Sequence, residues 1–245
     1  MIPIEYELDR LKEIIFEMFG LVKTQINEAK ISLTEMDNDL AESIIRRELR
    51  VNALEITIDR ECENLLACYN PVAADLRFVM SALKISESLE RISDHAYKIA
   101  KYVQDGDVHK DVQLLKNLKM EELFDTIGIM VDYVVEALHN KDSKIAKKSF
   151  KLDKTINKTK KDAPGIIKKL IKEDINHVKN TLYFFNIIGK LERCGDLIKN
   201  IAEEIIFYIE AEIVKHQKRN KKIRKRIEKI PDTEQNKDDQ FLATN

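Results

Sequence analysis

Two segments of twelve residues in this chain resemble each other, and this duplication limits the folds that the sequence can adopt. The segment Leu89–Ala100 reads LERISDHAYKIA, and Leu191–Ala202 reads LERCGDLIKNIA. Both contain Leu-Glu-Arg, then an Asp, then Ile-Ala, at the same spacing. Glu90 corresponds to Glu192 at an offset of 102 residues. Self-similarity at a fixed offset predicts two copies of one structural unit.

A second correspondence lies upstream of each copy. Glu48 aligns with Asp153 at an offset of 105 residues, and Asn52 aligns with Asn157 at the same offset. A loop absorbs the small difference between the two offsets. The sequence therefore predicts two repeats followed by a charged, disordered tail, with the boundaries 1–105, 106–217 and 218–245.

Six long segments carry the periodicity of amphipathic helices. Only six glycines and four prolines interrupt the chain, and no segment alternates with a period of two, so we expect no sheet. Short polar connectors favour antiparallel neighbours. The predicted fold class is all-α, with two repeated three-helix bundles built from six long antiparallel helices. The expected helices span residues 5–35, 38–69, 72–104, 109–140, 142–171 and 174–217.

Several residues carry signals for the ends of these helices. Asn70 precedes Pro71, which is the order expected for an N-cap and the first residue of a helix. Gly106 lies in a polar stretch that predicts a turn. The segment DAPG, residues 162–165, is expected to kink or end a helix, and a new helix is expected to start near Asp174.

Composition and charge exclude several classes of protein. Lys and Arg total 42 and Asp and Glu total 43, so the net charge of −1 gives no support for nucleic-acid binding. No apolar run approaches the ~18 residues of a membrane span, and the first residues lack the apolar core of a secretion signal. The three cysteines have no metal-binding or disulfide-like spacing. We therefore expect a cytoplasmic protein with reduced thiols that is not an integral membrane protein.

The sequence also gives little support for catalysis. It contains no glycine-rich phosphate loop. It has no serine–histidine–aspartate or cysteine–histidine arrangement at a recognisable spacing. We therefore expect a protein that is not an enzyme.

The acidic residues of each duplicated segment lie on one helix face. At 100° per residue, Glu87 and Glu90 fall within about 40° of Asp94, opposite the apolar stripe of the same helix. Glu192 and Asp196 repeat this arrangement in the second copy. In both copies the same angular line is apolar one or two turns earlier, which argues against a face that is simply solvated.

A second acidic arc is expected on the preceding helix of the first repeat, formed by Glu48, Asn52, Glu55 and Asp59. The second repeat has Lys160 where the first has Glu55. Carboxylates that meet across helices need a positive charge, and a metal ion bound by oxygen ligands supplies it in many helical bundles. Magnesium, calcium, manganese, iron and zinc all accept such ligands. His95 is interpreted as a flanking residue, because it lies about 100° from Asp94 on the helix.

These residues and motifs resemble those of the PhoU family, the phosphate transport and signalling regulators of bacteria. The segment Asn70–Ala100 is similar to the first family signature, with Ala-Ala-Asp-Leu-Arg followed by Leu-Glu-Arg-Ile-x-Asp. The segment Gly189–His216 is similar to the second, including Asn-Ile-Ala-Glu and the closing histidine. The resemblance covers about residues 5–217 and implies two three-helix bundles related by pseudo-symmetry.

The resemblance also implies where metal binds. PhoU proteins can hold multinuclear iron or zinc clusters on Glu/Asp-x-x-x-Asp motifs, and other divalent metals stay open. The ligands implied with this resemblance are Glu90, Asp94, Glu192 and Asp196, and then Glu48 and Asp153; helix geometry adds Glu87. Lys190 and Lys160 lie near the second motif, so we expect the first repeat to bind metal better.

For function, the resemblance implies a cytoplasmic negative regulator of phosphate uptake and of phosphate-starvation signalling. Such a protein is expected to form a homodimer and to contact two partners, the ATPase subunit of a phosphate ABC importer and a membrane sensor histidine kinase. Two alternatives stay open. One is a metal-storage or metal-dependent phosphate-binding helical protein, and the other is a helical adaptor for a different phosphate permease.

Overall fold

The structure, a computed structural model, describes residues 3–173 and 175–214. All regular elements in this part of the chain are helices, as predicted, and the helical region up to residue 212 forms one compact unit. The elements are α1 (Ile4–Glu35), α2 (Asn38–Tyr69), α3 (Ala73–Gln104), α4 (Val112–Asn117), α5 (Met120–Asn140), α6 (Ser143–Glu173), the 3₁₀ helix η1 (Ile175–His177) and α7 (Val178–Glu210).

The first repeat is a bundle of three antiparallel helices, α1, α2 and α3, each of 32 residues. Their apolar residues recur every three or four positions and are buried, so packing of the amphipathic faces stabilises the helices. Asp37 fixes the start of α2, because Leu40 N donates a hydrogen bond to its Oδ1 at 3.0 Å. The duplicated segment Leu89–Ala100 lies in α3.

The second repeat differs at its first helix, because the expected helix 109–140 is broken into α4 and α5. Lys119, between the two helices, adopts a left-handed backbone with φ 54°. Leu118 and Met120 are both fully buried on either side of it. The apolar pattern therefore continues across the break, which is why periodicity alone predicted one helix here.

One further predicted boundary, at Asn70, was wrong. Asn70 is not an N-cap: it follows the end of α2 in a left-handed conformation, with φ 48°, which asparagine tolerates better than most residues. Helix α6 runs through Pro164 to Glu173, close to the predicted end at residue 171, so the DAPG segment does not end it. Proline removes one helical hydrogen bond, yet the buried side chains of Ala163 and Ile167 hold this turn against the bundle.

The last predicted helix is shorter than expected, and the predicted turn at Gly106 is confirmed. Helix α7 ends at Glu210, followed by Ala211 with φ 56°. Gly106 has φ 68°, a backbone conformation that glycine adopts without strain. Asp174 and the predicted tail, residues 218–245, lie outside the described residues.

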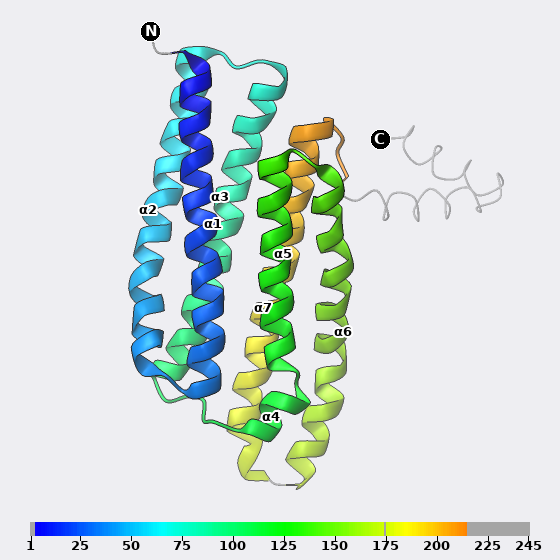
Figure 1. Ribbon diagram of the computed structural model, residues 1–245. Helices are drawn as coiled ribbons and strands as arrows, with labels where there is room; N and C mark the ends of the chain where they lie inside the picture. Colours follow the sequence, from blue (N-terminus) through cyan, green and yellow to red (C-terminus); the bar gives the residue numbers. More distant parts are fainter. Residues whose placement is uncertain (1–2, 174, 215–245) are drawn as a thin grey trace, which may run out of the picture. The chain divides into compact units, whose positions relative to one another are not determined.

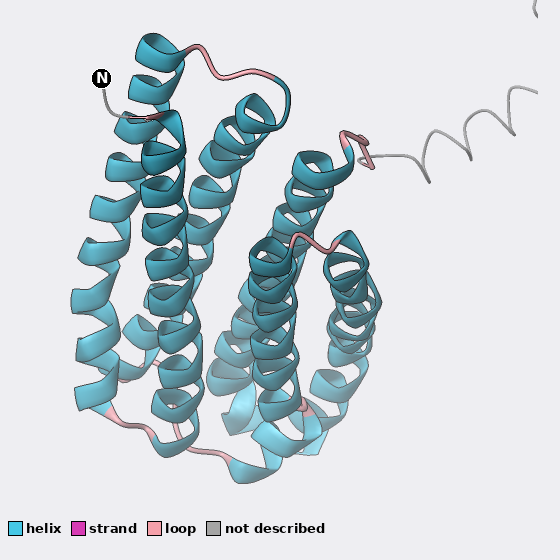
Figure 2. Cartoon of the chain, turned by 45° about the horizontal axis from the view of Figure 1, so that its top comes forward, coloured by secondary structure: helices cyan, strands magenta, loops and turns pink. Residues whose placement is uncertain are grey.

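Two pairs of helices join the repeats side by side, α3 with α7 and α1 with α5 (Figures 1 and 2). Between α3 and α7, Ser81 Oγ donates to the carbonyl oxygen of Glu204 at 3.2 Å. Lys84 Nζ lies 3.1 Å from the Glu204 carboxylate. Between α1 and α5, Lys30 pairs with Asp125 at 2.6 Å. Polar contacts therefore fix how the two repeats meet.

The core of each repeat contains large, fully buried aromatic side chains. Phe19 lies in the first repeat, and Phe124 and Phe184 lie in the second. Replacing such a side chain by alanine costs about 3–5 kcal/mol of stability. The buried apolar residues of the helices form this core. None of the helices in the described residues is long and apolar enough to cross a lipid bilayer.

Candidate metal-binding faces

Adjacent helices bring the predicted ligands of the first repeat onto one surface. Helices α2 and α3 pack against each other, so the acidic arc of α2 faces the acidic line of α3. We call this surface the first acidic face; it contains Glu48, Asn52, Glu55, Asp59, Glu87, Glu90 and Asp94. The second acidic face is formed in the same way by α6 and α7, and contains Asp153, Asn157, Glu192 and Asp196.

Negative charges on the first acidic face repel one another across the two helices. Burial raises the pKa of the Glu90 carboxyl group, and the charges of Asp94 and Glu48 raise it further. Burial likewise raises the pKa of Glu55, with a further contribution from the charge of Glu90. The side chains of Glu48, Glu55 and Glu90 are therefore close enough to interact, although they come from different helices.

Few positive charges compensate this face. The two that reach it pair one turn along α3: Arg91 with Glu87 at 3.9 Å, and Lys98 with Asp94. Ion pairs of this exposed kind contribute little. In the described part of the chain, no lysine or arginine lies within ion-pair distance of the remaining glutamates, Glu48, Glu55 and Glu90.

Asn52 provides a further oxygen atom that lacks a partner. Its Nδ2 donates to Glu48 Oε1 at 3.0 Å, whereas its Oδ1 is buried and accepts no hydrogen bond. A buried polar atom in this state costs about 1–3 kcal/mol. Carboxylate and amide oxygens together suit a hard divalent cation, so the donor set of the first acidic face fits a metal ion.

The second acidic face repeats the asparagine contact. Asn157 Nδ2 donates to Asp153 Oδ2 at 3.1 Å, one turn apart on α6. Asp153 is 5% exposed, and its Oδ1 accepts no hydrogen bond. It lies beside Gly195 of α7, where an added Cβ would sit 3.6 Å from this oxygen. The duplicated Asn–carboxylate pair shows that the repeat extends to side-chain geometry.

Two lysines distinguish the second face from the first. Lys160 Nζ lies 2.7 Å from Glu192 Oε2, and Lys199 Nζ lies 3.9 Å from both Asp153 and Asp196. Burial raises the pKa of Asp153, but the charge of Lys199 lowers it. This face therefore carries its own counter-charge, and its residues fit a metal ion less well.

The carboxylates of both faces are spread out rather than gathered on one point. Among the residues that the structure describes, no group of three or more His, Cys, Asp or Glu side chains is arranged to hold a metal ion. Glu87 lies at the outer edge, with its side chain 65% exposed. Binding of a metal therefore requires these surface side chains to rotate toward a common centre.

His95 lies on the seam between α3 and α7 and not on the first acidic face. It is 9% exposed, and its Nδ1 is buried without a hydrogen-bond partner. Burial lowers the pKa of the imidazole to about 4, so the ring is neutral at pH 7. Its position in the second repeat is taken by Leu197, which is also buried. His95 therefore flanks the first acidic face, on the side of α3 that packs against α7.

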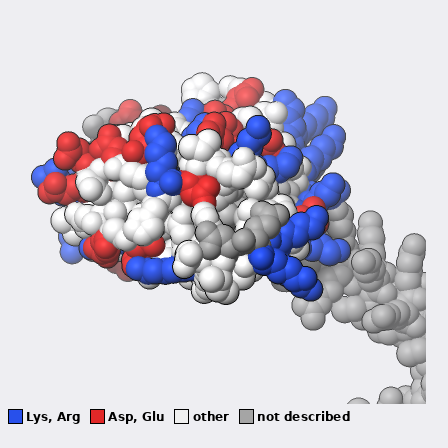
Figure 3. Space-filling model, turned by 90° about the horizontal axis from the view of Figure 1, so that it is seen from below, with Lys and Arg blue, Asp and Glu red and all other residues white. Residues whose placement is uncertain are grey.

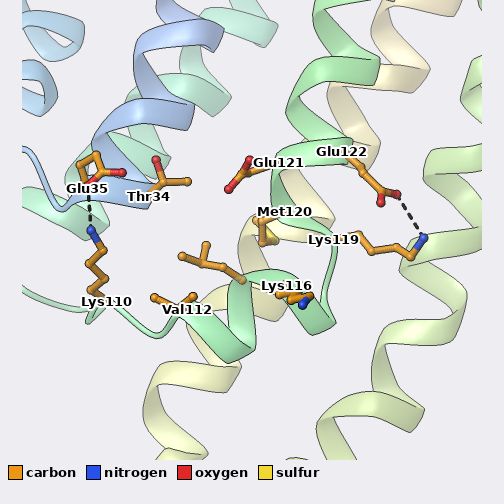
Figure 4. A pocket seen from close by; sticks show the side chains of 10 residues that line it. Thr34, Glu35, Lys110, Val112, Lys116, Lys119, Met120, Glu121 and Glu122 are labelled. Carbon is orange, nitrogen blue, oxygen red and sulfur yellow. Dashed lines mark hydrogen bonds and ion pairs between the residues drawn. The ribbon is translucent and has the colours of Figure 1, made fainter.

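A surface cavity of about 500 Å³ lies between the end of α1, helix α4 and the start of α5 (Figure 4). Lys110 pairs with Glu35 at 2.7 Å on one side, and Lys119 pairs with Glu122 at 3.1 Å on the other. None of the acidic-face residues lines it. The cavity depends on the turn at Lys119, so a reading that expected one continuous helix had no signal for it.

Comparison with known proteins agrees with the repeat. The family model described as PhoU domain matches residues 15–103 and 120–205, one match in each repeat. The phosphate-specific transport system accessory protein PhoU of Serratia marcescens is 32% identical over 213 residues, which cover 86% of each chain. The protein of the same name from Escherichia coli is 30% identical, with the same coverage.

Two crystal structures share the fold. PhoU from Pseudomonas aeruginosa superposes with a TM-score of 0.79 and 28% identity, over 86% of this chain and 100% of that one. The phosphate transport system regulatory protein PhoU from Streptococcus pneumoniae gives 0.76 and 26%, over 86% and 99%. Both similarities extend over the two bundles and not over one repeat alone.

Proposed function

This chain belongs to the PhoU family, and from that membership we propose that it is a regulatory accessory protein of a phosphate transport system. The observation that carries the proposal is the double family match, together with relatives about 30% identical over most of their length that bear this name. In this role the protein acts in the cytoplasm as a negative regulator of phosphate uptake and of phosphate-starvation genes.

The regulator works by contact with other proteins and not by catalysis. Its proposed partners are the ATPase subunit of a phosphate ABC importer and a membrane sensor histidine kinase, and it acts as a homodimer. A rigid pair of bundles with polar outer faces supports this reading, since such a scaffold can present two surfaces at once. Co-purification from lysate identifies the partners, and light scattering of the purified protein measures the dimer.

Deletion of the gene in the bacterium that carries it tests the regulatory role. We expect phosphate uptake and alkaline phosphatase activity to rise in phosphate-rich medium, and both to return to normal when the gene is restored. Unchanged uptake and unchanged repression after deletion would contradict the proposal. Recovery of a different permease in the co-purification would favour the adaptor alternative instead.

We further propose that the first acidic face binds metal. Glu48, Glu90 and Asp94 would hold the ion, with Glu55 and the unpartnered oxygen of Asn52 nearby. A bound divalent ion, whether iron, zinc or another, supplies the positive charge that these carboxylates lack. The site would lie between α2 and α3, where no lysine or arginine of the described residues forms an ion pair with Glu48 or Glu90.

The second acidic face would bind metal weakly or not at all. Its candidate ligands are Asp153, Glu192 and Asp196, and each already has a lysine within 4 Å. A cation would have to displace Lys160 or Lys199 before it could reach these carboxylates. We therefore propose unequal binding by the two repeats.

A second candidate function is metal-dependent phosphate binding, and the unbalanced charge of the first acidic face favours it. A metal ion held by surface carboxylates keeps coordination positions open to solvent, and a phosphate oxygen can fill one. Equilibrium dialysis with radioactive phosphate, with and without metal, measures this directly.

Elemental analysis of the purified protein separates the two functions. We expect metal in the wild-type protein and a loss of it in the double variant Glu90→Ala/Asp94→Ala. If this variant loses metal but still restores regulation in the deletion strain, the metal stabilises the protein and does not act as the switch. If regulation fails while the fold is retained, metal binding is part of the signal.

A further inference from the structure

Among the helices that the structure describes, α6 carries the most uneven charge. Its 31 residues include 11 lysines and only three acidic residues, with no arginine. Helix α6 lies at the outer edge of the second bundle (Figure 1). Seen from below, lysine and arginine side chains gather on that edge, whereas acidic side chains are frequent on the opposite edge (Figure 3).

The lysines occupy one side of the helix. At 100° per residue, all of them except Lys160 fall within an arc of about 160°. The buried residues Ala146, Ile156 and Ala163 lie on the other side. We call this surface the lysine face; it extends from Lys144 to Lys172, a distance of about 42 Å at 1.5 Å per residue.

Most of these lysines have no carboxylate partner. Lys147 pairs with Glu210, and Lys160 pairs with Glu192 on the second acidic face. Within the described residues, the other nine lysines of α6 have no carboxylate at ion-pair distance. In the first repeat, by contrast, most surface cations pair with an acid, as Lys12 does with Asp9 at 2.6 Å.

The lysines also repel one another. Lys151, Lys154, Lys158 and Lys161 follow at spacings of three and four residues, which place like charges next to each other on a helix. Such pairs destabilise a helix. Among the described residues, no carboxylate forms an ion pair with these four lysines, so a polyanion outside the protein would be bound favourably by the whole face.

We propose that the lysine face binds the surface of a lipid bilayer that contains anionic lipids. Lysine is a compact, strongly hydrated charge, and it is depleted from the cores of protein–protein interfaces. The face has no arginine fork, and Lys148 Nζ already lies over the ring of Tyr133, 5.3 Å from its centroid. Arginine forks and free aromatic rings are the groups that read or stack on nucleic acids. A long row of lysine charges suits a flat surface whose negative charge is diffuse, such as that of an anionic bilayer.

A second copy of this chain is a poorer partner. The first acidic face could attract the lysine face of another molecule, but this contact joins two different surfaces. A contact of that kind extends into open chains unless the rotation closes a ring.

The preference for a bilayer over nucleic acid also rests on the proposed role beside a membrane importer.

Sedimentation of the full chain with vesicles tests the proposal. We expect binding to vesicles that contain phosphatidylglycerol and none to vesicles of pure phosphatidylcholine. A lysine near an anionic surface contributes about a fivefold gain in partitioning. The triple variant Lys151→Gln/Lys154→Gln/Lys158→Gln should therefore bind at least tenfold more weakly at low salt.

A control variant removes the same charge elsewhere. Lys12, Lys101 and Lys119 each have an acidic partner three or four residues away on or beside their own helix, so their replacement by glutamine should lower vesicle binding by less than threefold. A second control changes Lys221, Lys222 and Lys225 to glutamine, because the chain beyond the described residues is also basic. Equal losses in the α6 and control variants, or a loss in the tail variant alone, would overturn the proposal.

Duplex DNA of random sequence provides the last comparison. If the protein binds this DNA through the same lysines and does not sediment with anionic vesicles, the partner is nucleic acid and the proposal is wrong. These assays use purified protein, so they do not depend on the deletion phenotype. Vesicle binding can therefore fail while the regulatory proposal stands, and the reverse also holds.

Discussion

Lys160 Nζ lies 2.7 Å from Glu192 Oε2, and this ion pair joins α6 to α7 on the second acidic face. The aligned residue of the first repeat is Glu55, whose pKa is raised by burial and by neighbouring carboxylates. One position therefore carries a counter-charge in one repeat and an additional negative charge in the other. This difference accounts for much of the inequality between the two faces.

If the first acidic face binds metal as proposed, Lys160→Glu should make the second face bind it too. In metal-free protein the change removes an ion pair and adds a carboxylate beside Glu192, so we expect it to destabilise the fold by roughly 1 kcal/mol. In metal-loaded protein we expect more ions per chain and a recovery of the melting temperature. Elemental analysis and thermal unfolding with and without chelator measure both effects.

Lys158→Glu serves as the matched control, because it makes the same charge change on the exposed side of α6. It should leave the metal content unchanged. If both variants bind the same amount of metal as the wild type, the lysine is not what keeps metal from the second face.

Glu90→Gln should have opposite effects with and without metal. Without metal it removes one of several repelling charges, so the free energy of unfolding should rise by a few tenths of a kcal/mol to about 1 kcal/mol. With metal it removes a ligand, so the stabilisation gained on metal addition should shrink. Urea denaturation, carried out once with chelator and once with added metal, measures the change in the free energy of unfolding under each condition. Glu13→Gln, on an exposed part of α1, should change neither value, and a similar rise in both variants would argue against charge repulsion on the first face.

The sequence predicted most directly those features of the site that follow from the geometry of a single helix. Glu90 and Asp94 share a face because of helical geometry alone, and the repeat follows from matching letters. The contact between Lys199 and Asp153 was missed, because it depends on how closely α6 and α7 approach. Such distances are set by packing and are not visible in the order of residues.

The same distinction holds for the fold: features of single helices were predicted, and features that depend on packing between helices were not. Long amphipathic helices were confirmed, since burial of an apolar stripe determines them. The break at Lys119 was missed because buried residues continue on both sides of it. Asn70 was predicted to be an N-cap because Pro71 follows it, but asparagine also tolerates the left-handed conformation that ends a helix, and this is the conformation it adopts after α2.

Acidification should stabilise the metal-free protein through the first acidic face. The pKa values of Glu55, Glu90 and Asp59 are raised in the folded state, so the folded protein binds these protons more readily than the unfolded chain. Their contribution to stability is therefore present below the ordinary carboxyl pKa, and it is lost as the pH rises through the folded values. At pH 7 the repulsion is at its maximum.

The double variant Glu55→Gln/Glu90→Gln isolates this contribution. In chelator, its stability advantage over the wild type should be greatest at pH 7 and should shrink toward the ordinary glutamate pKa of 4.5. Other titrating groups, such as His95, are present in both proteins and cancel in the difference. Urea denaturation at a series of pH values measures it. An advantage that grows on acidification would mean that the carboxylates are stabilised by charges that we have not identified.

Only one of the three cysteines should react in the folded protein. Cys68 is exposed on α2, whereas Cys62 and Cys194 are buried in the two repeats. Burial raises the pKa of the Cys62 thiol to about 12 and also raises that of Cys194, so neither forms the reactive thiolate near pH 8. A disulfide reagent should therefore titrate one thiol per chain in buffer and three in urea, and Cys68→Ser should reduce the count in buffer to zero. Rapid reaction of a second thiol would show that one of the two bundles opens more readily than its packing indicates.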